Sequence, residues 1–437
     1  MRLLKIWLGL LCLVAVIACQ PANAQAADPS PAAPQIPQSV FSIADYGAVS
    51  DGNTLNTTAI TKAIAACKAA GGGVVHIPSG QYLTGPFDLT SKMNLHLDEG
   101  SSLMFTDSPD AFPISDNRHR HAIAAEACTD IAITGKGTID GQGNQWWADF
   151  LKVKGKPEQK TATRRPNLID LGNCKRVLVQ GVLLRNSPNF HLVPRDCDDV
   201  VIDGVRFSAP ADAPNTDAMD PSGHNYVITR CVFDVGDDCI AFKPQRARKD
   251  GLPSCQDILV TDCTFKHGHG LSIGGQTAGG MRRLVVRNCT FDGTDAGIRM
   301  KASRGQGGLV EDLTYDNITM KNVKVAIFIT SYYPNNTTPK QPDKEPPQPL
   351  TATTPIWRNI RISNVTASDC DEAGRIIGLA EMPLSDLRLK NVKLSAVKGM
   401  QIFNASKVQF EDCEVKAARG EPWTLGNADV TGLARKD

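Results

Sequence analysis

The sequence has 437 residues, with 47 lysines and arginines against 46 acidic residues, and 41% of its residues are hydrophobic. A near-neutral chain has no overall positive field, so any affinity for a polyanion must be local, and we expect no nucleic-acid partner. Length alone would allow two or three domains, but the internal repeats described below favour one.

The first 24 residues have the pattern of a bacterial export signal. Basic residues at positions 2 and 5 precede an apolar run over residues 6–18, which is too short to span a bilayer, and Ala22-Asn23-Ala24 is a small-residue cleavage pattern. An alternative is a lipoprotein signal that ends before Cys19 and leaves this cysteine as a lipid anchor. We therefore expect a secreted or periplasmic protein, with an outer-membrane lipoprotein as the alternative.

Residues 25–40 are rich in Ala, Pro and Gln and are predicted to be a flexible spacer, so the folded domain is expected over residues 41–437. Near its start, Ile60, Ala63, Ile64 and Cys67 have the spacing of one apolar helix face. Asn56 or Thr57 can cap the start of this helix, and three glycines at 71–73 end it. We predict a short N-terminal helix that caps a solenoid.

Nine segments of alternating apolar residues recur along the chain, each broken by a glycine or a polar residue. Anchored on that residue, they lie at Gly181, Gly204, Arg230, Asp262, Asn288, Asn317, Asn364, Asn391 and Asp412. The intervals are 23, 26, 32, 26, 29, 47, 27 and 21 residues, so all but one fit one supersecondary unit per repeat. Short strands without long amphipathic helices between them predict a parallel β-helix, a single all-β domain.

The one long interval contains residues 334–355, which include seven prolines. This segment is predicted to project from the solenoid as a loop. It follows Tyr332-Tyr333, and two interpretations stay open: it narrows a binding groove, or it is a surface insertion without substrate contact.

Eleven cysteines follow the signal region, which would suit disulfides in an exported protein. Cys231, Cys263, Cys289 and Cys413 occupy the same position of the repeat, so we predict that they form a buried apolar ladder instead. No Cys-x-x-Cys pair is present, and we expect no metal site.

Four polar motifs lie at repeat-like spacing between residues 215 and 301. They are Asn215-Thr216-Asp217, Gly236-Asp237-Asp238-Cys239, His267-Gly268-His269-Gly270 and Arg299-Met300-Lys301. Each falls in a similar part of its repeat, and successive turns lie about 4.8 Å apart, so the motifs are expected to line an elongated groove. Carboxylates suit protonation of a leaving oxygen and activation of water, and two cations suit an acidic substrate, so we predict hydrolysis of an acidic glycan.

These ordered motifs resemble the polygalacturonase family of pectin-cleaving glycoside hydrolases. Further similar stretches are FSIADYGAVSDG from residue 41, GTIDGQGNQWW from residue 137 and RRPNLIDL before residue 173. The resemblance covers most of the chain. It implies a right-handed parallel β-helix, hydrolysis of α-1,4-galacturonosidic bonds with inversion, a galacturonan substrate and no cofactor. We expect the enzyme to be a monomer.

The resemblance also implies residue roles. Asp237 corresponds to the general acid, and Asp217 and Asp238 to the residues that hold and deprotonate water. His269 corresponds to the histidine that supports the acid's protonation state. The predicted substrate-binding residues are Asn215, Arg299, Lys301 and Tyr333, with Tyr332 as the weaker candidate for the tyrosine.

Several positions depart from the family pattern. Ala218 follows the first aspartate where glycine is common, and Met300 replaces isoleucine. Lys243-Pro244-Gln245 and Gly274-Gly275-Gln276 also differ from the usual residues. None of these changes removes a charged catalytic group, but they flank the predicted groove, so the preferred pectin backbone stays open.

Adjacent residues of a regular strand point to opposite faces, so Asp237 and Asp238 need an irregular turn, which Gly236 would permit. Other functions remain as alternatives: a hydrolase of rhamnogalacturonan or another decorated pectin, a calcium-dependent pectate lyase, and a non-catalytic glycan-binding β-helix. Cleavage within the polymer and cleavage from its end are both compatible with the motifs.

Overall fold

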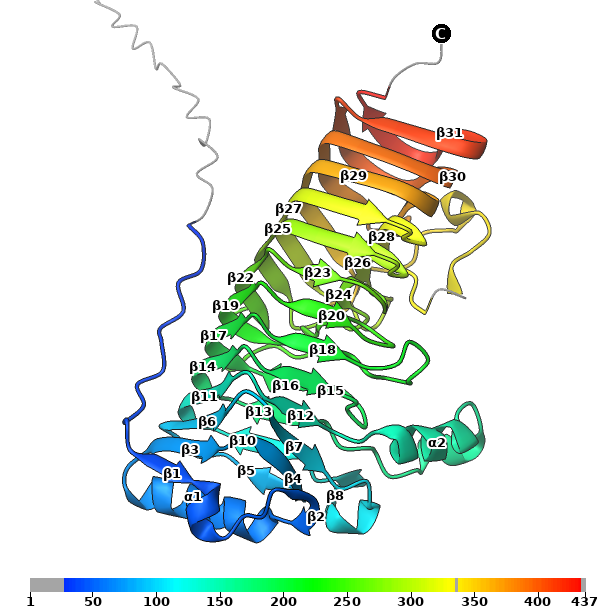
Figure 1. Ribbon diagram of the computed structural model, residues 1–437. Coiled ribbons are helices and arrows are strands. Elements are labelled where there is room, and N and C mark those ends of the chain that lie inside the picture. The colour runs from blue at the N-terminus through cyan, green and yellow to red at the C-terminus, as the bar shows by residue number, and fades with distance from the viewer. Residues whose placement is uncertain (1–26, 335–336, 434–437) are drawn as a thin grey trace, which may run out of the picture.

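The computed structural model describes residues 27–334 and 337–433. Its strands stack into a right-handed parallel β-helix (Figure 1), as the sequence predicted. Their pairings run along three lines, here called the first, second and third faces, and one turn of chain contributes to each face in order.

The first face consists of β1 (Val40–Ser42), β3 (Gly73–Ile77), β6 (Met93–Leu97), β11 (Thr129–Gly135), β14 (Lys175–Gln180), β17 (Cys197–Asp203), β19 (Gly223–Thr229) and β22 (Cys255–Thr261). The second consists of β2 (Asp51–Leu55), β4 (Gly80–Thr84), β7 (Ser101–Phe105), β12 (Thr138–Asp140), β15 (Leu183–Arg185), β18 (Arg206–Ser208), β20 (Val232–Asp234) and β23 (Thr264–Phe265). The long strands β25 (Met281–Asp292), β27 (Leu309–Lys321), β29 (Ile356–Ile377), β30 (Leu384–Glu411) and β31 (Glu414–Thr431) pass from face to face in the later turns.

The third face positions the predicted site. Its strands are β5 (Phe87–Asp88), β10 (Ile123–Glu126), β13 (Ile169–Gly172), β16 (Leu192–Arg195), β21 (Ile240–Phe242), β24 (Leu271–Gly274), β26 (Ala296–Lys301) and β28 (Val325–Thr330). A single residue, Met219, bridges β16 and β21 and completes the face between them.

The repeat anchors mark the corner between the first and second faces. All nine have a positive φ, from 51° at Asn317 and Asn391 to 78° at Gly181. Left-handed backbone is the conformation that glycine, asparagine and aspartate adopt most readily, which explains why these residue types recur at the anchors. Asparagine side chains also bond to each other across turns, as Asn317 does to Asn288 at 2.8 Å.

Inward-pointing side chains of the three faces fill the core. Phe207, Phe233, Phe265 and Phe291 stack on one another in consecutive turns, with ring centroids 5.1, 4.8 and 4.3 Å apart. These residues are fully buried, and each fills the same position of its turn. The stack gives the strands a register in which every turn repeats the last.

Three of the four predicted cysteines, Cys231, Cys263 and Cys289, form the buried ladder, whereas Cys413 lies in a later turn and is only partly buried. In the four predicted cysteines, the thiol donates to the carbonyl two residues earlier at 3.2 Å, and the thiols of Cys231, Cys263 and Cys289 contact one another. All eleven cysteines in the described part of the chain are free thiols.

The stretch expected to be helical forms α1 (Thr57–Ala69), which lies at the N-terminal end of the stack (Figure 1) and packs on β1 and β3. Its four predicted apolar residues are buried. The preceding residues 27–39 run along the solenoid, where Asp28 pairs with Arg287 at 2.6 Å and the amide of Gln35 donates to Asp130 at 2.9 Å. The predicted signal and Cys19 lie outside the described residues.

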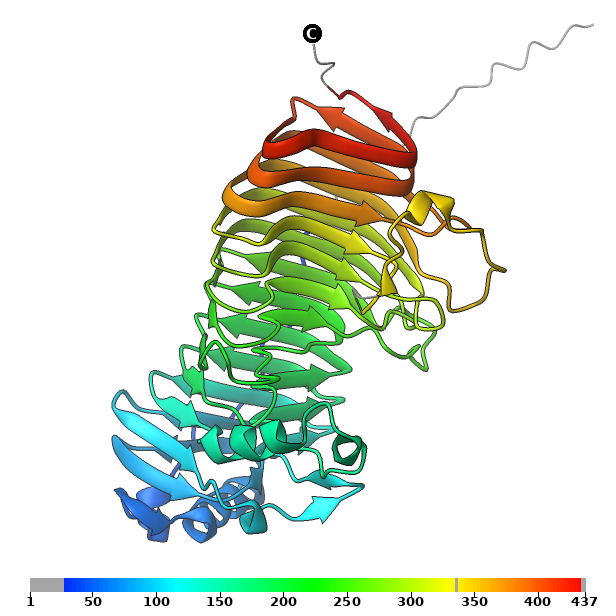
Figure 2. The same cartoon turned by 90° about the vertical axis from the view of Figure 1, so that its right-hand side faces the viewer.

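A helix, a hairpin and a loop project from the stack beside the third face. Helix α2 (Asn144–Val153) and the antiparallel hairpin of β8 (Ile114–Ser115) and β9 (Arg118–His119) extend from the early turns (Figure 2). The proline-rich loop leaves after β28 and returns at β29, as predicted. It is tied to the stack by Glu345, whose carboxylate lies 3.0 Å from Arg304. No described helix is long and apolar enough to cross a membrane.

Candidate active site

The three acid- and histidine-containing motifs meet on the third face, in the bends that lead into its middle strands. The amide of Ala218 donates to the carbonyl of Asp238 at 2.9 Å, and the amide of His269 donates to the carbonyl of Asp237 at 2.9 Å. These backbone bonds place Asp217, Asp238 and His269 on neighbouring turns, as their spacing predicted.

The basic pair lies on the next strand of this face. In β26, Ile298 and Met300 are buried in the core, so Arg299 and Lys301 between and after them point outward. The pairing of β24 with β26 sets Ser272 beside Arg299 and Gly274 beside Lys301. The prediction that the two cations share one strand face is thus confirmed.

Asp238 is the centre of this group of charges. Its side chain is only 4% exposed, and Arg299 Nη1 and Lys301 Nζ donate to its two oxygens at 2.6 and 2.9 Å. The hydroxyl of Ser272 donates to it at 2.8 Å. Burial opposes ionisation, but Lys301, His269 and Arg299 outweigh it and hold the pKa of Asp238 well below its ordinary value.

Asp237 faces His269 and is more open to water, with 23% of its side chain exposed. His269 Nδ1 lies 3.1 Å from Oδ1 of Asp237 and 3.6 Å from Oδ1 of Asp238. Burial lowers the pKa of His269, but hydrogen bonds and charge from the two aspartates raise it to about 9. Burial likewise raises the pKa of Asp237, and the bond to His269 reverses that shift and leaves it lowered. The proton of this pair therefore resides on His269 in the free enzyme.

Asp217 has a different environment, because its nearest charges include a second acid. Lys243 Nζ lies 3.5 Å from Asp217 and 3.3 Å from Asp220, and both carboxyls are buried. Burial and the neighbouring Asp220 raise the pKa of Asp217 well above its ordinary value, against the opposing effect of Lys243. Burial also raises the pKa of Asp220 to about 6. Asp217 therefore retains its proton at a pH at which Asp238 is ionised.

The adjacent pair Asp237-Asp238 reaches one site because the chain bends sharply before β21. Gly236 is needed there for close packing and not for a positive φ. A side-chain carbon at this position would lie 2.5 Å from the carbonyl oxygen of Ala213 and 2.7 Å from that of Pro210. The irregular turn was predicted correctly, but the physical reason for its glycine differs.

Asn215 links Asp237 to a buried cation. Its side-chain nitrogen lies 3.4 Å from Oδ2 of Asp237, and its oxygen accepts a bond from Arg165 at 2.9 Å. Arg165 also donates to the carbonyls of Pro188 and Pro214 at 2.7 and 3.0 Å. Asn215 thus contacts the predicted acid directly.

The two tyrosines of the predicted pair have separate environments. Lys301 Nζ lies 5.2 Å from the centre of the Tyr333 ring, beside the basic pair. The Tyr332 side chain is buried, and its hydroxyl bonds to Glu345 of the projecting loop. This arrangement favours Tyr333 as the tyrosine of the site. His267, the other histidine of this motif, is 58% exposed and pairs with Asp234 outside the group around Asp238.

Comparison with known proteins identifies the family. Residues 67–426 match the model described as glycosyl hydrolases family 28. This chain belongs to that family. It is 30% identical to a probable polygalacturonase of Vitis vinifera, over 81% of this chain and 74% of the relative. It is 31% identical to an endo-polygalacturonase of Pectobacterium parmentieri, over 80% and 87% of the two chains.

A solved structure of this fold is similar over nearly the whole length. The exopolygalacturonase of Thermotoga maritima superposes with a TM-score of 0.73 at 27% identity, covering 92% of this chain and 94% of its own. The predicted resemblance to polygalacturonases is confirmed. The chain is a family 28 glycoside hydrolase.

Sequence reasoning missed several side chains of this family 28 site. They are Arg165, Asp220, Lys243, Ser272 and Asp295, the last of which lies 3.3 Å from His269 Nε2. Apart from Asp220, which follows Asp217 by three residues and pairs with Lys243, each contacts a predicted residue from a different turn, so sequence distance hides the contact. A weak signal existed for Asp220 and Ser272, because both lie on the outward side of third-face positions that are in register with Arg299.

Asp237, Asp238 and His269 also have the donor types and the closeness that could hold a metal ion, within 4.8 Å of one another. However, Arg299 and Lys301 already contact both oxygens of Asp238, and a divalent cation there would be set against two positive charges. The donor set therefore fits the alternative of a calcium-dependent lyase poorly.

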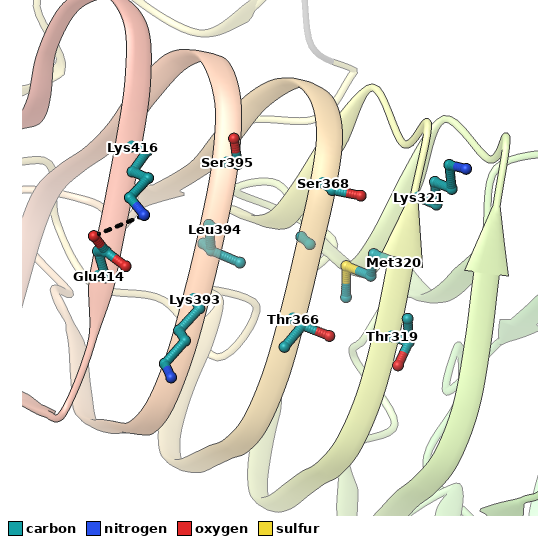
Figure 3. A pocket seen from close by; sticks show the side chains of 11 residues that line it. Thr319, Met320, Lys321, Thr366, Ser368, Lys393, Leu394, Ser395, Glu414 and Lys416 are labelled. Atoms are coloured by element: carbon teal, nitrogen blue, oxygen red, sulfur yellow. Dashed lines mark ion pairs between the residues drawn. The ribbon is translucent and has the colours of Figure 1, made fainter.

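A separate hollow lies over the late turns, on β27, β29, β30 and β31 (Figure 3). It is lined by Thr319, Met320, Lys321, Thr366, Ala367, Ser368, Lys393, Leu394, Ser395, Glu414 and Lys416. Its one carboxylate, Glu414, is paired with Lys416 at 3.1 Å. It contains none of the predicted site residues and, among its lining residues, no second carboxylate.

Proposed function

We propose that this family 28 enzyme hydrolyses the α-1,4-galacturonosidic bonds of galacturonan with inversion. The observation that carries the proposal is the ionised Asp238, held by Arg299 and Lys301 directly beside the Asp237 and His269 pair. The names of the relatives, which are polygalacturonases of plant and bacterial origin, support the same substrate.

The acid of the reaction is Asp237. In the free enzyme it is ionised opposite a protonated His269, so it must gain a proton before it can protonate the leaving oxygen. A bound sugar removes the water that still reaches Asp237, and loss of solvation raises the pKa of a carboxyl group. The proton then moves from His269 to Asp237, and from there to the glycosidic oxygen as the bond breaks.

The base of the reaction is Asp238. The substrate carboxylate competes for Arg299 and Lys301, which weakens their hold on Asp238 and raises its pKa toward that of an effective base. Asp238 then takes a proton from the water that attacks the anomeric carbon, while the still-protonated Asp217 orients that water. One displacement from the face opposite the leaving group inverts the configuration. The uronate carboxylate thus activates the base that deprotonates the attacking water.

The test is product analysis on polygalacturonate. Reducing sugar should appear in the presence of a chelator, without ultraviolet absorbance of an unsaturated product, and nuclear magnetic resonance should show the inverted anomer first. Rhamnogalacturonan in a parallel assay should be a poorer substrate. Activity that is lost on chelation and restored by calcium, or an unsaturated product, would overturn the proposal.

We also propose that the chain is exported and works as a monomer without a cofactor. The charged, apolar and small-residue pattern of the first 24 residues supports export. N-terminal sequencing of the mature protein distinguishes a start at residue 25 from a lipid-modified Cys19, and light scattering measures the oligomeric state.

A further inference from the structure

A cavity of about 370 Å³ opens on the third face beside Asp220 and Lys243. Its other walls come from earlier turns: Asp170 on β13, Arg195 on β16 and Arg118 on β9. It therefore lies on the N-terminal side of the catalytic carboxylates, whereas Arg299 and Lys301 lie on the C-terminal side.

The charges that face this cavity leave one cation without a partner. Arg195 pairs with the buried Asp170 at 2.7 Å, and Lys243 pairs with Asp220 at 3.3 Å. Among the described residues, no carboxylate lies within ion-pair distance of Arg118, whose Nη1 has only the carbonyl of Arg165 at 3.4 Å.

The protonation states of His121 and Arg118 leave that excess of positive charge in place. His121 lies 3.5 Å from Asp170, and burial lowers its pKa, so it is neutral near pH 7. Burial and the nearby Arg164 lower the pKa of Arg118 against the opposing charge of Asp170, which Arg195 already neutralises, and the guanidinium stays charged at any working pH. A half-buried cation without a counterion costs free energy, and a bound anion offsets that cost.

The cavity also has an aromatic wall. Phe190 is half-buried, lines the cavity, and lies 5.5 Å from Lys243 Nζ. An apolar ring face together with a few placed polar groups is the usual composition of a site for a small ring-shaped ligand. The unpartnered guanidinium specifies that such a ligand carries a negative charge.

We propose that this cavity is a second carboxylate subsite, which takes a uronic acid unit of the substrate chain. Arg118 binds its carboxylate, and Phe190 packs against its ring. The inference rests on the proposed function, because that function places a polymer of uronic acids across Asp217 and Asp238. The enzyme then recognises carboxylates on both sides of its catalytic centre.

Binding to a catalytically inactive enzyme tests this subsite without hydrolysis. In an Asp237→Asn background, isothermal titration calorimetry measures the affinity for trigalacturonate before and after Arg118→Gln. Loss of a charge-assisted hydrogen bond should weaken binding about ten- to a hundredfold. With carboxyl-reduced trisaccharide the two proteins should bind equally, since no carboxylate remains for Arg118.

Arg120→Gln is the matched control. Arg120 lies two residues after Arg118 and directly follows β9; it pairs with Asp88 at 2.8 Å and does not line the cavity. It should leave the affinity unchanged, and thermal melting should show that both variants fold. Equal affinity of the Arg118→Gln protein and its parent for trigalacturonate would overturn the subsite.

This outcome is distinct from failure of the proposed function. A wild-type enzyme that binds trigalacturonate through Arg118 but does not hydrolyse galacturonan would refute the function and support the subsite. If the wild-type enzyme hydrolyses galacturonan but the Arg118→Gln variant keeps the affinity of its parent for trigalacturonate, the result supports the function and refutes the subsite.

Discussion

The two adjacent aspartates of the site differ in how much of each side chain is exposed to water, and this difference suits them to different roles. Asp237 is 23% exposed and Asp238 is 4% exposed. If Asp237 is the acid, Asp237→Asn should lower kcat by about two to four orders of magnitude with little change in substrate affinity. Kinetics and calorimetry on polygalacturonate measure both quantities. The control is Asp234→Asn, at the exposed pair with His267, and an active Asp237→Asn enzyme would assign the acid elsewhere.

His269 connects catalysis to stability through its pKa, which rises from 6.5 in the unfolded chain to about 9. Since the folded pKa is the higher one, the stabilisation is complete below pH 6.5 and disappears as pH rises through about 9. The melting temperature of His269→Gln should therefore fall below that of the wild type most at pH 6 and converge with it near pH 10. A gap that widens with pH would contradict this assignment. Activity of the variant should also show a shifted pH profile.

At the level of structural elements, the bend before β21 holds the catalytic pair in place. A methyl group at position 236 would meet two carbonyl oxygens of the preceding turn, so Gly236→Ala must displace Asp237. We expect kcat to fall at least tenfold, because small misplacements of catalytic groups are costly. The matched control is Gly204→Asn, at an anchor with φ of 62° and open space around it, where asparagine is tolerated at equivalent anchors. Normal activity of Gly236→Ala would show that the bend does not position the acid.

Structural elements that depend on local sequence periodicity could be predicted, whereas contacts between separate turns could not. The anchors, the cysteine ladder and α1 were predictable because each depends on local periodicity: a left-handed residue, a repeated small side chain, or an apolar helix face. The contacts of Asp220 with Lys243 were not, because they join separate turns in a buried charge cluster. Arg118 was missed for a related reason, since it lies on a short hairpin outside the repeat.

At the scale of the whole molecule, the described part of the chain is held by its stacked turns, and no disulfide joins its cysteines. All eleven described cysteines are free, although the sequence has the pattern of an exported protein. Thermal unfolding should therefore be unchanged, within about 1 °C, when a reducing agent is added, whereas loss of a native disulfide typically costs about 2–5 kcal/mol. Thiol titration of the unfolded mature protein should count every cysteine. A large drop in melting temperature on reduction would show that pairs form in the protein.

The alternation of inward and outward side chains on the third face has a consequence for how such an enzyme diverges. Inward residues such as Ile240 and Ile298 are fully buried and hold the stack together, whereas outward neighbours such as Asp220 and Ser272 contact the charged groups of the site. Ala241 occupies one of these outward positions, between Asp220 and Ser272. Substitutions at such positions change the polar groups of the site while the inward core residues of the stack stay in place. New substrate preferences are therefore accessible in single steps, and a library confined to outward positions is a direct route to them.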